Sequence, residues 1–393
     1  MPERNLDFDT ITDRRNTNSL KYDFAAERGK PADVLPLWVA DMDFKTSSYI
    51  EDALIERCRH AIFGYSEVKT PYFEAVRDWM IRHHGWEPQE DWLIKTTGVV
   101  NALALAVQAY TKPGEAVLLQ EPVYYPFSEV ITDNARKRVS SDLVLGEDFR
   151  YHIDFEDFER KIIEHGVKLF LLCSPHNPGG RVWTREELTR MGDICLRHGV
   201  IVVSDEIHAD FVFKGTHTVF STIRPEFEDN CVICTAASKT FNLASMLNSN
   251  IFIPNPVLRQ KFKKRKDASG MSQIGILGFV ATETAYRQGE EWYQAMLSYI
   301  KENIAYTKQF VKKQIPGVRM MEPEGTYLVW LDFHGTGLSD REVDDRIIHK
   351  AKLWLDTGAI FGPVGEGFQR ICVACPRSIL TEALKRIRDA ILI

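Results

Sequence analysis

Five short apolar segments recur along the first two thirds of the chain, and segments with the spacing of amphipathic helices lie between them. The apolar segments are residues 116–120, 167–173, 199–205, 230–236 and 249–255. One intervening segment carries helix-boundary signals, with Thr184 three residues before Glu187 at its start and Gly199 at its end. Near-continuous Val, Ile and Leu strands that alternate with helices are typical of a mainly parallel sheet covered on both faces. The pattern therefore predicts an α/β core over residues 50–285.

The pattern changes after residue 285. A long helical segment (290–314) is followed by a strand pair (316–333) and another helix. A glycine-rich loop (356–368), a strand (369–375) and a last helix come after them. This order predicts a smaller α+β unit over 286–393, joined by an N-terminal arm over 1–49. The sequence has no internal repeat and no low-complexity linker, so we expect the two units to pack closely.

Composition and charge narrow the possible partners. The chain has 393 residues, of which 44% are hydrophobic and 26% charged, and its formal net charge is -6. The one dense basic run, 261–266, is followed by Asp267 and has the character of a solvated helix end, so we expect no nucleic-acid partner. No apolar run approaches the roughly 18 residues of a membrane span, and the N-terminus has no apolar signal region. We therefore expect a cytoplasmic protein with no membrane partner.

Seven cysteines are scattered along the chain, an odd count that suits a reducing compartment. Two CxxC spacings occur, Cys231 with Cys234 and Cys372 with Cys375. Both lie in strand-like runs, where residues i and i+3 point to opposite faces, and neither has the turn residues of a zinc knuckle. We expect core cysteines and no metal site.

Polar side chains follow three of the apolar segments where each segment ends. Asn177 follows the second segment, Asp205 ends the third and His208 follows it, and Lys239 follows the fourth. Ligands of open parallel sheets bind outside the carboxyl ends of the strands, so these four side chains are predicted to meet at one sheet edge. Each also has a structural alternative: a turn for Asn177, a helix cap for Asp205, a hydrogen-bonded core position for His208 and a surface ion pair for Lys239.

A candidate phosphate cradle lies earlier in the chain. Thr96, Thr97 and Gly98 precede a predicted helix whose first free N–H groups belong near Val99 and Val100. The dinucleotide motif GxGxxG and the nucleotide motifs GxxxxGKS and GxxxxGKT do not occur in the sequence, which argues against nicotinamide or nucleoside triphosphate chemistry. A phosphate cradle beside Asn, Asp, His and Lys would suit an aromatic aldehyde cofactor.

These residues carry a family resemblance. The chain resembles the fold-type-I pyridoxal phosphate enzymes, and within them the cystathionine β-lyase-type carbon–sulfur lyases of the class I/II aminotransferase superfamily. The resemblance rests on RRNTNSLKYD, VLPLWVADMDF, FGYSE, TGVVNALALAVQAYTKPG, EPVYYPF, LLCSPHNPGGRVWTREEL, VVSDEIHADFVF, SKTFNLAS, PEGTYLVWLDF and VACPRSIL. It implies a large domain with a mainly parallel seven-stranded sheet between helices, and a smaller C-terminal α+β domain.

The resemblance also implies roles around pyridoxal 5'-phosphate. Lys239 would bind the cofactor covalently and then act as the base at the substrate α-carbon, with Asp205 and Tyr124 as the other catalytic residues. Asp205 would pair with the pyridine nitrogen, and Tyr124 would stack on the ring; a core tyrosine is the alternative for Tyr124. The remaining cofactor contacts would come from Asn177 and His208 at the phenolic oxygen and from Gly98, Val99, Val100, Ser238 and Tyr65 at the phosphate. Tyr65 would reach over from a neighbouring subunit, which implies a homodimer with shared active sites.

Arg370 is the candidate for the substrate α-carboxylate. On its strand it shares a face with Cys372, so its guanidinium should be largely buried and needs an anion. Substrate is one such anion, and an internal Asp or Glu is the alternative. Ala40 and Asp41 would lie near the substrate through their backbone, together with the side chain of Asn177, whereas Arg377 is expected to be structural.

Several positions depart from the pattern of the family. Ala236 stands where many relatives have a phosphate-binding serine, and Leu247 where aminotransferases often have a phosphate-binding arginine. The other departures are Asn101, where proline is usual, Cys372, where asparagine is usual, and Asp356 with Ala359, in a loop that more often has Asn and Ser. Asp356 and Ala359 would affect which substrate the site accepts.

The resemblance favours cleavage of L-cystathionine-like amino acids to a thiol, pyruvate and ammonia, as in methionine biosynthesis. An aminotransferase for aromatic or sulfur-containing amino acids is the alternative, because the same residues serve both reactions. A mainly regulatory, partner-binding protein of this fold is a second alternative. Residues 1–44 are too short and arm-like for a helix-turn-helix, and the presence of Lys239 favours catalysis.

Overall fold

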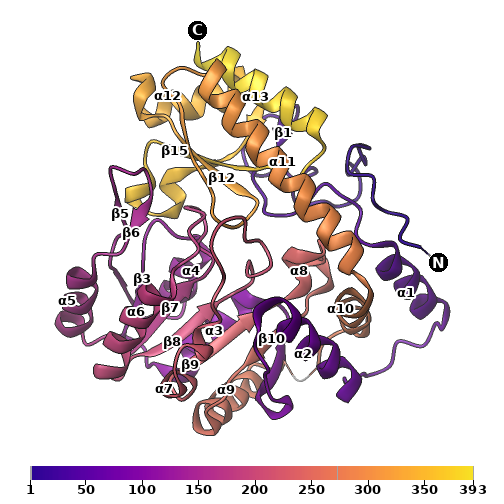
Figure 1. Ribbon diagram of the computed structural model, residues 1–393, viewed down its shortest axis with the longest axis vertical. Helices are drawn as coiled ribbons and strands as arrows, with labels where there is room; N and C mark the ends of the chain where they lie inside the picture. Colours follow the sequence, from indigo (N-terminus) through magenta and orange to yellow (C-terminus); the bar gives the residue numbers. More distant parts are fainter. Residues whose placement is uncertain (1, 272, 393) are drawn as a thin grey trace.

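A seven-stranded sheet forms the centre of the larger part of the molecule in the computed structural model, which describes residues 2–271 and 273–392 (Figure 1). The strands lie in the order β2 (Leu93–Thr96), β10 (Ser249–Phe252), β9 (Cys231–Thr235), β8 (Ile201–Asp205), β7 (Leu169–Cys173), β3 (Ala116–Leu119) and β4 (Lys137–Ser140). Strand β10 is antiparallel to both of its neighbours, and all other neighbouring pairs are parallel. The mainly parallel seven-stranded sheet is therefore confirmed.

Both faces of this sheet are apolar, because successive side chains of a strand point to opposite faces. In β7, Leu169 and Leu171 belong to one hydrophobic cluster, whereas Phe170 and Leu172 belong to the other. The first cluster includes helices α3 (Val99–Tyr110), α4 (Pro126–Thr132) and α9 (Pro256–Ala268). The second includes α2 (Thr70–His84), α5 (Phe155–His165), α6 (Arg185–Arg197) and α10 (Ile276–Gln288). Burial on both faces explains the near-continuous apolar character of the central strands.

Strands β2 and β4 are not among the five apolar segments of the sequence. They lie at the two edges of the sheet. In β2 (LIKT) half-buried and buried side chains alternate, whereas in β4 (KRVS) only Val139 is buried and Lys137 and Arg138 are exposed. An edge strand needs fewer apolar residues than a central one and tolerates charged side chains, so its hydrophobic signal is weaker.

A second sheet lies in the C-terminal part, at the top of Figure 1. It is antiparallel throughout, with the order β11 (Arg319–Met321), β12 (Leu328–Asp332), β15 (Phe368–Cys372) and β14 (Asp356–Thr357). Helices α11 (Glu290–Gln314), α12 (Asp340–Asp345) and α13 (Arg377–Ile391) accompany it. The expected loop 356–368 thus begins with a short strand, because Asp356 and Thr357 pair with Arg370 and Gln369.

The N-terminal segment joins this smaller unit, because β1 (Leu35–Pro36) pairs in parallel with β13 (Leu353–Trp354). Helix α1 (Ser48–Arg59) then packs against α10. The hairpin of β5 (Val144–Leu145) and β6 (Tyr151–His152) and the short helices α7 (Pro225–Glu228) and α8 (Ala237–Thr240) complete the strands and α-helices of the described residues. The boundaries 1–49, 50–285 and 286–393 stay predictions, and residues 1, 272 and 393 lie outside the described part of the chain.

Local signals in the sequence have the expected structural outcomes. The Thr184 side chain accepts a hydrogen bond from the Glu187 backbone N–H, and the Glu187 side chain accepts one from the Thr184 N–H, so α6 begins with a complete capping box. The basic run 261–266 lies in the C-terminal half of α9. The four cysteines of the CxxC pairs are buried, which confirms them as core residues. In the described part of the chain, no helix is both long and apolar enough to span a membrane.

Candidate active site

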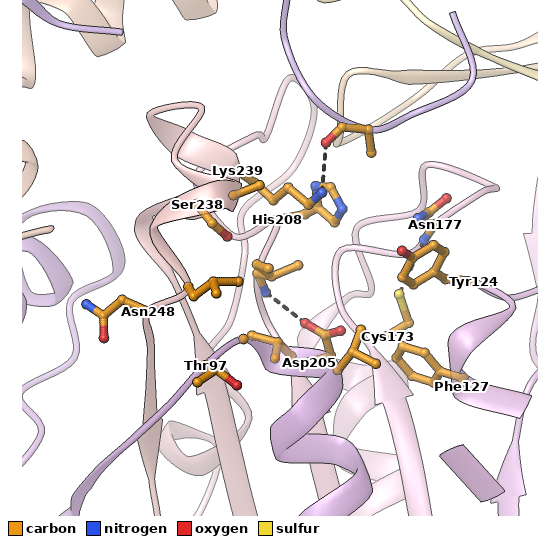
Figure 2. A pocket seen from close by; sticks show the side chains of 17 residues that line it. Thr97, Tyr124, Phe127, Cys173, Asn177, Asp205, His208, Ser238, Lys239 and Asn248 are labelled. Carbon is orange, nitrogen blue, oxygen red and sulfur yellow. Dashed lines mark hydrogen bonds between the residues drawn. The ribbon is translucent and has the colours of Figure 1, made fainter. Parts of the chain in front are cut away.

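A cavity of about 200 Å³ lies at the carboxyl ends of β7, β8 and β9, where the sequence predicts a site. Figure 2 shows the side chains of Asn177, Asp205, His208 and Lys239 around this one cavity. Asn177 follows β7, Asp205 ends β8, and Lys239 lies on α8 directly after β9. The predicted meeting of these four side chains at one sheet edge is therefore confirmed.

Lys239 is held by a carbonyl group. Its Nζ donates a hydrogen bond of 2.7 Å to the backbone oxygen of Ala40, and among the described residues it forms no ion pair. The surface ion pair considered for Lys239 is therefore wrong. Burial lowers the pKa of the Lys239 ammonium, although Asp41 acts in the opposite direction. A buried amine with a lowered pKa is suited to act as a nucleophile and as a base.

Asp205 lies on the floor of the cavity with little to stabilise its charge. Its Oδ1 accepts one hydrogen bond, of 3.1 Å, from the Ile207 backbone N–H. Burial raises the pKa of this carboxyl to about 7, although the Ile207 N–H and Lys239 act in the opposite direction. The carboxyl would become a stable anion next to a cation such as a protonated ring nitrogen.

His208 presents a polar atom without a partner. Its Nδ1 is buried and has no hydrogen-bond partner among the described residues. Burial, followed by the charges of Lys239 and Arg370, lowers the pKa of His208 well below its usual value, so the ring is neutral. A neutral imidazole at the cavity wall can hydrogen-bond an oxygen of a bound ring.

The N-terminus of α3 lies at the cavity, at the position where the sequence predicts a phosphate cradle. Gly98 stands before the helix with φ of +154°, a conformation that favours glycine, and no side chain caps the first turn. Val99 and Val100 line the cavity together with Thr97 and Ser238. The free N–H groups of a first helical turn and the helix dipole attract an anion.

Tyr124 lines the cavity as well, and its half-buried ring is not a plain core residue. Its backbone N–H donates to the Asn177 oxygen at 3.1 Å, which ties the EPVYYPF segment to the SPHNPGG loop. The ring centroids of Tyr124 and Tyr125 are 5.1 Å apart. This position suits an aromatic side chain that covers a flat ligand.

Arg370 already has an internal anion, which was the alternative raised from the sequence. Its Nη2 pairs with the Asp356 carboxylate and donates to the Trp38 oxygen at 2.8 Å, and its Nη1 donates to Asn177 Oδ1 at 3.0 Å. The guanidinium is buried and reaches the cavity wall through Asn177. A role for Arg370 at a substrate carboxylate stays a prediction. Arg377 donates to Asn303 Oδ1 at 2.6 Å, as suits a structural residue.

Asp41 and Tyr65 are not brought into the cavity within one chain. Asp41 does not line it, and its carboxylate pairs with Arg14 at 2.7 Å and has Lys21 Nζ at 3.4 Å; the expected backbone contact of Asp41 with substrate stays a prediction. Of the pair Ala40 and Asp41, only Ala40 lines the cavity. Tyr65 is 96% exposed and lines a second, larger cavity of about 990 Å³. The single chain thus leaves Tyr65 without any contact to Lys239.

Further lining residues were not among the candidates from the sequence: Phe127, Cys173, Ile207, Ala244 and Asn248. Cys173 is the last residue of β7 and Phe127 follows EPVYYP, so proximity to the strand ends and to Tyr124 could have indicated them. Leu247, which stands where an arginine is common, lines both cavities with φ of +49°. Ala236 is the N-cap of α8.

The chain is similar to known proteins along nearly its whole length. Cystathionine beta-lyase PatB of Bacillus subtilis (strain 168) is 42% identical to this chain, over 98% of this chain and 100% of PatB. The crystal structure of cystalysin from Treponema denticola, which contains pyridoxal 5'-phosphate, has a TM-score of 0.94 and 38% identity, over 98% of each chain. The PLP-bound C-S lyase of Staphylococcus hominis has a TM-score of 0.91 and 32% identity, over 98% of this chain and 99% of the lyase. The sequence profile of aminotransferase class I and II matches residues 33–387. The chain therefore belongs to the aminotransferase class I and II family.

Proposed function

We propose that the chain is a pyridoxal phosphate-dependent carbon–sulfur β-lyase that acts on L-cystathionine and related amino acids. Lys239 carries the proposal, because its amine has a lowered pKa and faces a cavity whose other polar groups match the cofactor. The named relatives support the lyase reaction, since PatB, at 42% identity, is a cystathionine beta-lyase and the Staphylococcus protein is a C-S lyase.

The residues of the cavity fit pyridoxal 5'-phosphate. The unpartnered His208 Nδ1 and the Asn177 side chain would hold the phenolic oxygen, and Asp205 would hold the ring nitrogen as a cation. Val99, Val100 and Ser238 would hold the phosphate. When bound, the cofactor supplies a ring that withdraws electrons from the substrate α-carbon.

Lys239 would move the protons of the reaction. As a neutral amine it accepts the α-proton, and the Ala40 carbonyl fixes the direction of its Nζ. The bond between the β-carbon and sulfur then breaks, and the electron pair leaves with sulfur as a thiolate, which takes up a proton. Addition of water to the remaining three-carbon fragment gives pyruvate and ammonia, so that one thiol, one pyruvate and one ammonia form from each substrate and one water.

The cavity wall would exclude water from the reacting carbon. The Tyr124 ring and the apolar side chains of Phe127, Ile207 and Leu247 line the cavity around its few polar groups. Exclusion of water strengthens the interaction of Asp205 with a ring cation, because charges interact more strongly at low dielectric.

A homodimer with shared active sites would complete the site. Ile62, Phe63 and Tyr65 are 66%, 59% and 96% exposed, an apolar group that a second copy of the chain would cover. Tyr65 would then reach the phosphate of the neighbouring subunit. Sedimentation velocity should give a dimer, and Phe63→Glu should yield monomers with lower affinity for the cofactor. A wild-type monomer with full activity would contradict this arrangement.

We also propose a reducing compartment, the cytoplasm, as its place of action. All seven cysteines are unpaired, and six of them are buried. Cysteines of secreted proteins more often form disulfides. Detection of the protein in the periplasmic or culture fraction of cells that express it natively would contradict this assignment.

The decisive experiment measures pyruvate from L-cystathionine with the purified, cofactor-loaded protein and no added 2-oxo acid. Many turnovers per site are expected. Lys239→Ala should abolish them, and Lys352→Ala, which changes an exposed lysine paired with Asp33, should not. An aminotransferase would instead release no pyruvate, convert its cofactor to the amine form once per site, and turn over again only when a 2-oxo acid is added. Absence of both reactions would favour the regulatory alternative.

A further inference from the structure

Asp356 and Arg370 form a buried ion pair beside the candidate active site. The two residues lie directly opposite each other on the antiparallel strands β14 and β15. Asp356 is 5% exposed and Arg370 is 2% exposed. An opposed pair of this kind is neutral as a unit, so the guanidinium has little net charge to offer to another anion.

The guanidinium nevertheless keeps an unused donor. Asn177, Trp38 and Asp356 bond the two terminal nitrogens, whereas Nε is buried and has no acceptor among the described residues. A buried donor without an acceptor is costly, so this N–H favours the arrival of a further acceptor. A ligand carboxylate at Arg370 would supply it.

The arrival of that carboxylate creates a conflict of charge. Two carboxylates would then share one guanidinium in a buried place, and like charges at such distances destabilise each other strongly. The Phe361 ring, whose centre lies 4.9 Å from the Arg370 guanidinium, has no charge that could offset a second carboxylate. The carboxylates of Asp356 and of the ligand therefore cannot both remain ion-paired with Arg370.

The Asp356 side chain borders an open space into which it can move. It lines a separate cavity of about 430 Å³ that is also lined by Lys30 and Arg28. Burial raises the pKa of Asp356, whereas Arg370 and then Lys30 act in the opposite direction, as expected for a cation on the same cavity. A cation beside open space can receive the carboxylate when a ligand takes its place.

We propose that Asp356 is an affinity-determining residue that competes with the substrate α-carboxylate for Arg370. The inference rests on the proposed function, in which Arg370 binds that carboxylate. Asp356 weakens the binding of every α-amino acid to the site. When an amino acid binds, the Asp356 carboxylate leaves Arg370 and turns towards Lys30. A neutral residue at position 356 therefore gives a site with higher affinity for amino acids.

Binding of two probes by calorimetry to the cofactor-loaded protein tests this proposal. L-Norleucine has the α-carboxylate, n-pentylamine is the same molecule without it, and neither has a leaving group on its β-carbon. Asp356→Asn keeps an oxygen for Arg370 and removes the charge. We expect it to bind L-norleucine about 10- to 100-fold more tightly than the wild type, with n-pentylamine changed less than about twofold.

Asp344→Asn is the matched control. Asp344 accepts a hydrogen bond from Gln369, the neighbour of Arg370 on β15, so the same charge is removed from a partner of the adjacent residue. It should change the affinity for L-norleucine much less than Asp356→Asn does and leave the affinity for n-pentylamine unchanged. Asp356→Ser provides a second neutral variant, and thermal unfolding identifies any variant that fails to fold.

The possible outcomes separate the two proposals. Unchanged or weaker binding of L-norleucine to both neutral variants would overturn the competition, and so would equal tightening for both probes. Failure of the wild type to bind either probe would overturn the proposed amino-acid chemistry itself.

Discussion

The Lys239 ammonium and the Ala40 carbonyl are joined by a hydrogen bond of 2.7 Å, which connects the large sheet to the N-terminal segment. The same carbonyl accepts a hydrogen bond of 2.9 Å from the Tyr327 hydroxyl, just before β12 of the smaller sheet. Three distant parts of the sequence thus meet at one oxygen atom. The position of the proposed base depends on how firmly the segment around Ala40 is held.

Asn242 holds that segment, so we expect Asn242→Ala to lower activity without removing any group of the cavity. Its side chain accepts from the Met42 N–H at 3.0 Å and donates to the oxygens of Met42 and Phe44 at 2.9 and 3.1 Å. Loss of these bonds should cost about 1–3 kcal/mol of unfolding free energy. Urea unfolding and the kcat of pyruvate release check both effects, and unchanged kcat in a destabilised variant would contradict the positioning role.

Asp205 should make the stability of the cofactor-free protein depend on pH. Its pKa in the fold is about 7, above the ordinary 3.8, so folding takes up a proton between these values. The contribution of Asp205 to stability is therefore complete below about pH 4 and is lost as the pH rises to about 7. Asp205→Asn, which cannot ionise, should be more stable than the wild type by about 1–3 kcal/mol at pH 8, and its advantage should be smaller at pH 5, where only part of the contribution is lost.

Urea unfolding of both cofactor-free proteins at the two pH values measures this difference. The cofactor-loaded proteins provide the control, because a ring cation would restore the charge of Asp205 and reverse the order of stability. An advantage of Asp205→Asn that is equal at both pH values would show that the carboxyl does not titrate in this range.

Removal of Arg370 should expose the cost of a buried, unpaired carboxylate. Arg370→Met leaves Asp356 without its main partner and should cost about 3–5 kcal/mol of unfolding free energy. The double variant Arg370→Met with Asp356→Asn should recover most of this loss. Arg386→Met, which breaks an exposed pair with Glu382, should cost less than about 1 kcal/mol. Additive losses in the double variant would contradict direct coupling of the pair.

Gly98→Ala should weaken the binding of phosphate. No atom lies within 4 Å of the position of the added Cβ, so the cost comes from the backbone, whose φ of +154° an alanine rarely adopts. The strain should shift the N–H groups of Val99 and Val100. Fluorescence titration should give an affinity for pyridoxal phosphate reduced about tenfold, which corresponds to about 1.4 kcal/mol.

Pyridoxal, which lacks the phosphate, is the control ligand and should bind both proteins alike. Gly337→Ala is the control variant, because Gly337 also has a positive φ, +73°, and open space around it, in an exposed loop. An equal loss of affinity for pyridoxal and for pyridoxal phosphate would show that the substitution does not act through the phosphate contacts.

The sequence predicted most of the fold and the four residues at the sheet edge, because both follow from local patterns. Runs of Val, Ile and Leu indicate buried strands. The residue after such a run lies at the carboxyl end of its strand, independently of the rest of the fold. The edge strands β2 and β4 were not predicted, because they are partly exposed and contain charged residues.

The partner of Arg370 could not be predicted in the same way. Asp356 precedes Arg370 by fourteen positions, and only the register of β14 against β15 places the two side chains opposite each other. Asp41 is similar, because its orientation depends on the ion pairs it forms with Arg14 and Lys21 of the N-terminal arm. Pairing across distant segments is a property of the folded chain, and residue types alone leave several partners open.

The hydrogen bonds of Trp38 and Ala40 have a consequence for the choice of substrate. The backbone oxygen of Trp38 accepts a hydrogen bond from Arg370, and the backbone oxygen of Ala40, two residues later, accepts one from Lys239. Two residues of chain span at most about 7 Å, so this short piece of main chain limits the distance between the Lys239 nitrogen, the proposed base, and the Arg370 guanidinium, the proposed carboxylate-binding group. We expect that interval to act as a fixed spacer, suited to α-amino acids and too short for β-amino acids, whose carboxylate lies one carbon farther away.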